Sequence, residues 1–200
     1  MREQFRKNYI RAKLGDPKEF SVVFVLSEKK RGGEMTDSEN LEECWLDDEV
    51  REELFRLQNE CIFMWVNSAG QPFGVTMSYI WRDGSFWLTC AKARKRVPAI
   101  EKTGYAAITI TSKGTALGTG KTASYRGPCT VYEEEETLKW MLPELANAVR
   151  PESEEGAKAF LEHLDTPNRV VLKLTPEYKL DFDSSKMWRH RPDAAPPGRL

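Results

Sequence analysis

The chain has 200 residues and a mass of 23.0 kDa, and 40% of its residues are hydrophobic. A chain of this length and composition can bury one substantial core, which excludes a disordered protein. Thirty basic residues face 31 acidic ones, so no overall positive field directs the chain to nucleic acid. No apolar run is long enough to cross a bilayer, and the first residues lack the apolar stretch of a signal peptide. We therefore expect a globular cytoplasmic protein without nucleic-acid or membrane partners.

The cysteines are spaced irregularly, and no C-x-x-C pair or neighbouring histidine completes a zinc set. This spacing predicts no metal site. Three of them, Cys61, Cys90 and Cys129, stand in apolar segments typical of strands. Such surroundings favour thiols that pack as small hydrophobic groups over reactive thiols.

The first 40 residues form a polar, basic stretch with a Gly-Gly pair, which predicts a flexible extension. Its one apolar run, Val22 to Leu26, fits either an edge strand or a segment that docks on a neighbouring subunit. From Asp47 to Glu60, apolar residues recur at helical spacing and acidic residues crowd the first turn, where the helix dipole favours them. This stretch predicts a helix that covers one face of a sheet.

The hydrophobic period then changes from helical spacing to two. Residues 61–90 contain three apolar segments separated by the turn signals Ala69 to Pro72 and Arg82 to Ser85, which predicts three strands in meander order. Three further elements follow in chain order: a basic crossover helix over 92–104, a fourth strand over 105–112 and a fifth strand over 122–132.

Helical periodicity returns from Glu133 to Asp165, and a last strand is expected from Asn168 to Phe182. Residues 191–200 are rich in proline and predict a disordered tail. Mostly antiparallel strands with short turns and peripheral helices define an α+β class and predict a small β-barrel, because strands do not alternate with long helices. Residues 41–190 are expected to form this single domain, with 133–165 as a helical insert.

The string from Gly114 to Thr122 resembles a phosphate-binding P-loop but does not match it. A P-loop needs a glycine five positions before Gly120, where Thr115 stands, and it must lead into a helix. Here the following residues are typical of a strand. The string therefore predicts a glycine-rich turn or bulge rather than a nucleotide triphosphate site.

A stronger signal is Thr89 followed by the cations Lys92, Arg94, Lys95 and Arg96. A hydroxyl and backbone N–H groups at a strand end can donate hydrogen bonds to a phosphate monoester, and an arginine can add a bidentate, charge-assisted pair. The competing interpretation is a solvated basic turn before a helix. Charge alone favours that second interpretation, and the surrounding sequence favours the first.

From Asp47 to Val131, short motifs follow one another in a particular order. A leading helix is followed by a strand with an x-G-x-P turn at Ala69 to Pro72 and a second strand that ends near Tyr79 to Gly84. The motif W-L-T at Trp87 to Thr89, a basic stretch and A-A-I-T-I at Ala106 to Ile110 complete the series. Each motif is short, and the specificity lies in their order. This order resembles that of the pyridoxamine 5′-phosphate oxidase-like FMN-binding split barrels.

The resemblance implies a split β-barrel that forms a homodimer with FMN in clefts at the subunit interface. Carried over by position, the resemblance implies that the flavin ring is lined by Thr76, Met77 and Ser78, and that the phosphate is held by Thr89, Arg94, Lys95 and Arg96. It also implies that Lys121 and Ser124 reach the ring or the ribityl chain, and that Trp188 reaches the flavin of the other subunit. Simpler alternatives exist for several of them, such as outward strand positions for Thr76 and Ser78 and a barrel cap for Trp188.

The sequence departs from true pyridoxamine phosphate oxidases in lacking their substrate-binding Arg and His constellation. The only histidines are His163 and His190, and His163 is more typical of a satisfied helix-end residue than of a base or haem ligand. The insert leaves two roles open, since it can shape a substrate pocket or extend the dimer contact.

The resemblance therefore implies an FMN-dependent oxidoreductase that acts on a small organic substrate, with NAD(P)H as electron donor. The flavin carries the redox chemistry and no side-chain nucleophile is required. Alternatives on the same fold are a deazaflavin-dependent reductase, which needs extra cations such as Lys92, Lys95, Lys113 and Lys121, and a haem protein, which the few histidines disfavour. A non-catalytic flavin or phosphate-ligand binder and a barrel without cofactor are the alternatives of a different class.

Overall fold

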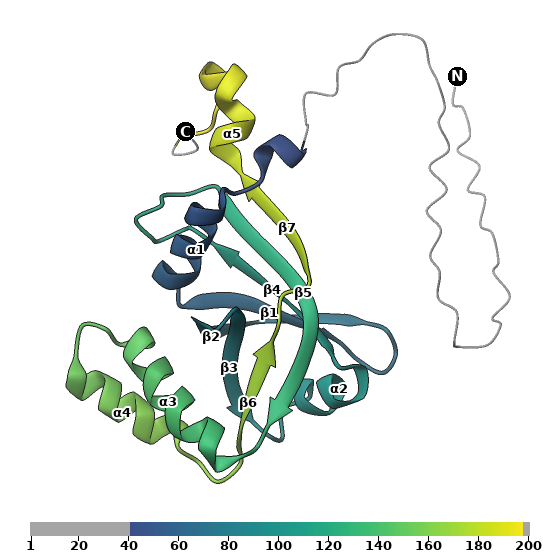
Figure 1. Ribbon diagram of the computed structural model, residues 1–200, viewed down its shortest axis with the longest axis vertical. Helices are drawn as coiled ribbons and strands as arrows, with labels where there is room; N and C mark the ends of the chain where they lie inside the picture. Colours follow the sequence, from purple (N-terminus) through teal and green to yellow (C-terminus); the bar gives the residue numbers. More distant parts are fainter. Residues whose placement is uncertain (1–40, 198–200) are drawn as a thin grey trace, which may run out of the picture. The chain divides into compact units, whose positions relative to one another are not determined.

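The computed structural model describes residues 41–197 (Figure 1). The predicted N-terminal extension, its apolar run and the last three residues of the predicted tail lie outside the described residues. The described part of the predicted tail contains a short 3-10 helix, Pro192–Ala194. No helix within 41–197 is long and apolar enough to span a membrane.

The described elements follow the predicted order. The strands are β1 (Glu60–Val66), β2 (Pro72–Arg82), β3 (Ser85–Ala91), β4 (Tyr105–Thr111), β5 (Lys121–Tyr132), β6 (Arg169–Leu174) and β7 (Tyr178–Asp183). The helices are α1 (Asp48–Leu57), α2 (Arg96–Thr103), α3 (Glu135–Val149), α4 (Glu154–Leu164) and α5 (Ser184–Met187). The short 3-10 helices η1 (Leu41–Cys44) and η2 (Trp188–His190) flank the first and last of these helices.

Six strands close into an antiparallel barrel in the order β4-β1-β2-β3-β6-β5, and β5 pairs back with β4. The seventh strand, β7, pairs with the first half of β5, and β6 pairs with its second half. The long strand β5 thus serves both the barrel and the added strand. This arrangement confirms the α+β class and the β-barrel expected from the sequence.

The single last strand expected from Asn168 to Phe182 is wrong in one respect, because the structure divides it at Pro176. The pairing register on β5 shifts by one residue there, from Cys129 opposite Leu174 to Arg126 opposite Tyr178. Proline has no N–H to donate to the ladder and is found in sheets at edges and bulges. The result is a β-bulge that bends the strand and separates β6 from β7.

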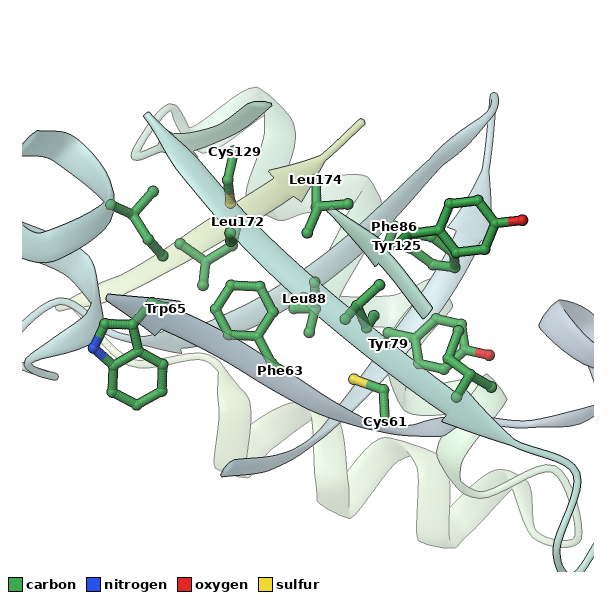
Figure 2. Packing of buried hydrophobic residues seen from close by; sticks show 14 of the residues in the cluster. Cys61, Phe63, Trp65, Tyr79, Phe86, Leu88, Tyr125, Cys129, Leu172 and Leu174 are labelled. Carbon is green, nitrogen blue, oxygen red and sulfur yellow. The ribbon is translucent and has the colours of Figure 1, made fainter. Parts of the chain in front are cut away.

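The barrel interior is filled by the inward residues of each strand, as Figure 2 shows. On β1 the inward residues are Cys61, Phe63 and Trp65, and exposed or half-buried residues alternate with them. This period of two is the one that the sequence predicted for a strand with one buried face. The central side chains Phe63, Leu88 and Leu172 are fully buried.

All four cysteines are free and buried, which confirms that the three in strand segments pack as small hydrophobic groups. Burial raises the pKa of Cys61 and of Cys129 to about 12. Since the folded pKa lies above the unfolded value, protonated thiols favour the folded state at neutral pH, and this contribution is lost as the pH rises from about 9 toward 12.

We expect the folded protein to resist a thiol reagent such as Ellman's reagent at pH 8, because a buried protonated thiol is a poor nucleophile. Unfolding in urea should release all four thiols. Absorbance of the released chromophore measures both states. Rapid reaction of any thiol in the folded protein would contradict this expectation.

The helical insert packs on the outside of the barrel. Helices α3 and α4 lie side by side, and α3 packs against β2, β3 and β6 (Figure 1). Their apolar faces meet Ile80, Trp87 and Val171 in a second hydrophobic cluster. The ring of Trp140 on α3 packs edge-to-face on Trp87, with 4.9 Å between ring centroids. The insert is therefore fixed to its own barrel.

The glycine-rich segment between β4 and β5 forms turns and leads directly into β5. Three of its glycines, Gly114, Gly118 and Gly120, have positive φ angles, which side chains with a Cβ rarely adopt. The segment does not start a helix. It confirms the predicted turn and rules out a P-loop.

Candidate functional site

A cavity of about 570 Å³ lies between the barrel and the helical insert. Strands β2 and β3 form its floor, α4 and the end of α3 form one wall, and the segment that enters α2 forms the other. Its lining consists of Met77, Ser78, Thr89, Cys90, Ala91, Arg94, Arg96, Leu145, Phe160, His163, Leu164, Thr166 and Arg169. The cavity size falls in the range of roughly 300–1,000 Å³ that is usual for small-molecule sites.

Arg96, the first residue of α2, is held against the barrel by two contacts. Its guanidinium lies over the ring of Trp65 at 5.3 Å from the centroid, and its Nη1 lies 3.1 Å from the Sδ of Met77. Its Nε is buried and has no hydrogen-bond partner within the described part of the chain. Leaving such a donor unpaired costs about 1–3 kcal/mol. An unpaired buried donor in a cavity wall marks a position where a ligand can accept a hydrogen bond.

Two further arginines, Arg94 and Arg169, line the same cavity. Among residues 41–197, no carboxylate lines the cavity, and neither these two arginines nor Arg96 forms an ion pair with one. Burial lowers the pKa of Arg169, and the nearby positive charge of Arg94 adds to this effect. Three cations that share a cavity without an acidic partner repel one another, so the cavity favours an anionic ligand.

Two side chains from β3 complete the floor. The Oγ1 of Thr89 donates to the carbonyl oxygen of Val170 at 2.7 Å. In this arrangement the Thr89 hydroxyl can accept a hydrogen bond from a ligand but does not donate one. Burial raises the pKa of the Cys90 thiol, although the nearby arginines oppose this shift. Cys90 is thus a neutral wall residue.

Five of the predicted site residues therefore meet in one cavity. They are Met77, Ser78, Thr89, Arg94 and Arg96. Met77 and Ser78 reach it from β2, Thr89 from β3, Arg94 from the turn after β3 and Arg96 from the start of α2. Of the hydroxyl and cation cluster that the sequence singled out, Thr89, Arg94 and Arg96 line this ligand-sized site, whereas Lys92 forms an ion pair with Glu133 at 2.6 Å.

The other predicted residues lie elsewhere on this chain. Thr76 is exposed on β2, and Lys95 lines a separate recess of about 290 Å³ together with Lys102. The Nζ of Lys121 lies 3.8 Å from the Oδ1 of Asp183.

Ser124 shares a 2.8 Å hydrogen bond with Thr109 on the outer face of β4 and β5. Trp188 is half-buried in η2, where α5 packs on η1. The resemblance places several of these residues across a dimer, so their roles stay predictions.

Sequence reasoning missed the residues that the insert and β6 add to the cavity. Phe160 and His163 on α4 stack with 6.4 Å between ring centroids, and Arg169 starts β6. From the sequence, His163 is more typical of a satisfied helix-end residue than of a cavity residue. No local motif surrounds these positions. The one signal in the sequence was that the insert is longer than a minimal barrel needs.

The chain matches no protein-family model, and no curated protein matches its sequence. Solved structures do match. A conserved hypothetical protein from Mycobacterium tuberculosis has a TM-score of 0.61 at 15% identity over 77% of this chain and 91% of that chain. A candidate pyridoxamine 5′-phosphate oxidase from Listeria innocua has a TM-score of 0.51 at 13% identity, over 66% and 95%. A FAD-binding protein from Mesorhizobium loti has a TM-score of 0.50 at 11% identity, over 68% and 94%.

The fold and the site thus define an antiparallel split barrel with a cationic cavity between barrel and insert. This fold is the split barrel of the pyridoxamine 5′-phosphate oxidase-like proteins, which confirms the resemblance read from the order of motifs.

Proposed function

We propose that this chain binds FMN in the cavity and acts in the cytoplasm as an FMN-dependent oxidoreductase on a small organic substrate, with NAD(P)H as electron donor. The observation that supports it is the set of three arginines without a carboxylate, one of which has a buried, unpaired Nε. Two proteins of similar structure, a FAD-binding protein and a candidate pyridoxamine 5′-phosphate oxidase, support a flavin on this fold.

The residues present fit FMN in charge and in polarity. Arg94 and Arg96 would hold the phosphate, because a guanidinium matches phosphate oxygens with charge-assisted hydrogen bonds. Met77 and Ser78 on β2 would line the ring, and Leu145 on α3 adds an apolar wall. When bound, the flavin supplies hydride or single-electron transfer.

The protein's own part in the reaction is binding, orientation and electrostatics. The insert forms one wall of the cavity. Arg94 and Arg96 would stabilise negative charge on the FMN phosphate, and no carboxylate among the described lining residues opposes them.

The proposal includes a homodimer. Large apolar residues stand exposed on the outer face of β1, β4 and β7, and a monomer rarely exposes so many together. They are Ile62, Val66, Tyr105, Tyr178 and Leu180. A second copy of this chain is the occupant that we assign to this face, as the split-barrel resemblance implies.

We expect mass photometry or light scattering to report a dimer, and Leu180→Glu to shift it to a monomer. Leu180 is 62% exposed on β7, so a charge there costs little in the folded monomer but much in a buried interface. Leu57→Glu is the matched control, because Leu57 is also exposed, at 46%, but lies on α1. A wild-type monomer, or a dimer that Leu180→Glu leaves intact, would contradict this assignment.

The experiment that tests the cofactor is an absorption spectrum of the purified protein, repeated after adding FMN and removing the excess by gel filtration. We expect retained flavin bands. A Soret band would show that the protein binds haem and would contradict the FMN proposal. A protein that retains no chromophore would contradict the FMN proposal and favour a deazaflavin or a role without cofactor. Retained FMN that no nicotinamide reduces would identify a carrier instead of an enzyme.

A further inference from the structure

The cavity contains one more arginine than the FMN phosphate needs. Arg94 and Arg96 lie close together where the chain enters α2, and they suffice for one phosphate. Arg169 comes from the start of β6, a different part of the barrel. In the sheet it stands opposite Ala91, the last residue of β3, which also lines the cavity.

Arg169 is held in place by the insert. Its Nε donates to the carbonyl oxygen of Leu164 at 2.7 Å. Leu164 is the last residue of α4, where backbone carbonyls lack partners within the helix. This hydrogen bond uses one of the five N–H groups of the guanidinium. The described residues give the terminal nitrogens no carboxylate partner, although the side chain is half-buried.

The neighbours of Arg169 in the cavity wall indicate what else a ligand would contact. Phe160 and His163 on α4 stack with an angle of 23° between their rings. Thr166 adds a hydroxyl on the segment that joins α4 to β6. A cation beside an aromatic surface suits a molecule with an anionic group and a flat or apolar body.

We propose that Arg169 forms a second anion subsite, which receives the anionic oxygen group of the substrate while Phe160 and His163 contact its body. The substrate is then a small organic anion, a carboxylate or a phosphate. This inference rests on the proposed function, because it assigns Arg94 and Arg96 to the FMN phosphate. It makes the insert the element that selects the substrate.

The first test uses the protein saturated with FMN, so that the phosphate position is filled. Benzoate and inorganic phosphate are titrated separately, and binding is followed by calorimetry and by the change in flavin absorption. We expect at least one of them to bind, and its identity distinguishes a carboxylate from a phosphate substrate. Arg169→Gln should weaken this binding by roughly tenfold to a hundredfold, as for loss of charge-assisted hydrogen bonds. Its FMN affinity should stay within about threefold of wild type.

Two variants control for changes in overall charge and in stability. Arg56→Gln removes the same charge from the exposed side of α1 and should change neither affinity. Arg169→Lys keeps the charge and a donor for Leu164 but loses the planar fork, so it should bind the anion with intermediate affinity at an unchanged unfolding temperature. If Arg169→Gln is unstable, the anion affinity of Arg169→Lys alone shows whether Arg169 binds the anion. Anion binding equal to wild type in the folded variant would overturn the inference, and so would a wild-type protein that binds neither probe.

A second measurement separates failure of this inference from failure of the proposed function. Calorimetry with inorganic phosphate on the FMN-free protein should show two sites in the wild type and one in Arg169→Gln. If FMN does not bind but this pattern holds, the FMN proposal fails and the second subsite stands. If FMN binds and Arg169→Gln leaves phosphate stoichiometry unchanged, the subsite is wrong and the FMN proposal stands.

Discussion

Replacing Arg94 and Arg96 together by alanine is expected to weaken FMN binding roughly 150-fold or more, because each charge-assisted hydrogen bond to a phosphate contributes about 1.5–3 kcal/mol. Arg96 should account for the larger part. It lies on Trp65, and its buried Nε has no partner among the described residues, so a phosphate oxygen would satisfy a donor that is otherwise unpaired. Quenching of FMN fluorescence on titration with protein measures the affinity.

Arg96 also covers Trp65 and contacts Met77, so its loss can disturb the wall itself. Arg96→Lys keeps the charge and much of the apolar stem and should lose less affinity than Arg96→Ala. The unfolding temperature of each variant shows whether the wall is intact. If the double alanine variant binds FMN as tightly as wild type, Arg94 and Arg96 do not hold the phosphate.

Lys95→Ala distinguishes the sequence prediction, in which Lys95 binds the FMN phosphate, from the structure, in which it lies outside the cavity. Lys95 stands between the two arginines in sequence, so the sequence predicts that all three bind the phosphate. The structure places it in a separate recess with Lys102. We therefore expect Lys95→Ala to change FMN affinity by no more than about threefold, the effect of an exposed charge. A loss as large as that of Arg94→Ala would place the phosphate on the other side of α2.

Gly127→Ala is expected to destabilise the fold by about 3 kcal/mol or more, the upper end of what added atoms cost in a packed site. Gly127 lies on β5 where the bulge between β6 and β7 crosses it. A Cβ there would overlap the carbonyl oxygen of Thr175, which is backbone and cannot turn aside. On either side of this point, Thr175 N–H donates to Pro128 at 3.0 Å and Glu177 N–H donates to Arg126 at 3.1 Å. The added methyl group must break this pairing.

Urea unfolding followed by circular dichroism gives the free energy of unfolding of each variant. Gly156→Ala is the matched control, since neither glycine has a positive φ angle. At Gly156 the nearest atoms belong to the flexible end of Arg150, and alanine favours the helix by up to about 1 kcal/mol. The control should be neutral or more stable. Equal effects of the two substitutions would show that the close approach at Gly127 does not limit stability.

The order and type of the elements could be read from the sequence because they depend on neighbours in the chain. The change from helical spacing to a period of two placed β1 to β5 and α1. The break at Pro176 was harder to see, since the residues on both sides still read as strand. A proline in such a run signals a bulge only when the partner strand is known, and that partner is β5.

The candidate site likewise contains residues that the sequence predicted and residues that only the structure brings together. Thr89, Arg94 and Arg96 lie within a few residues of one another, so composition and a resemblance in motif order were enough to find them. The sequence by itself determined the split barrel and this cationic wall. Only the tertiary structure decided that the insert folds back over the cavity, that Arg169 joins the arginines and that Lys95 turns away. Closure of the barrel and packing of α4 bring together residues that are distant in the chain, and no local pattern encodes such contacts.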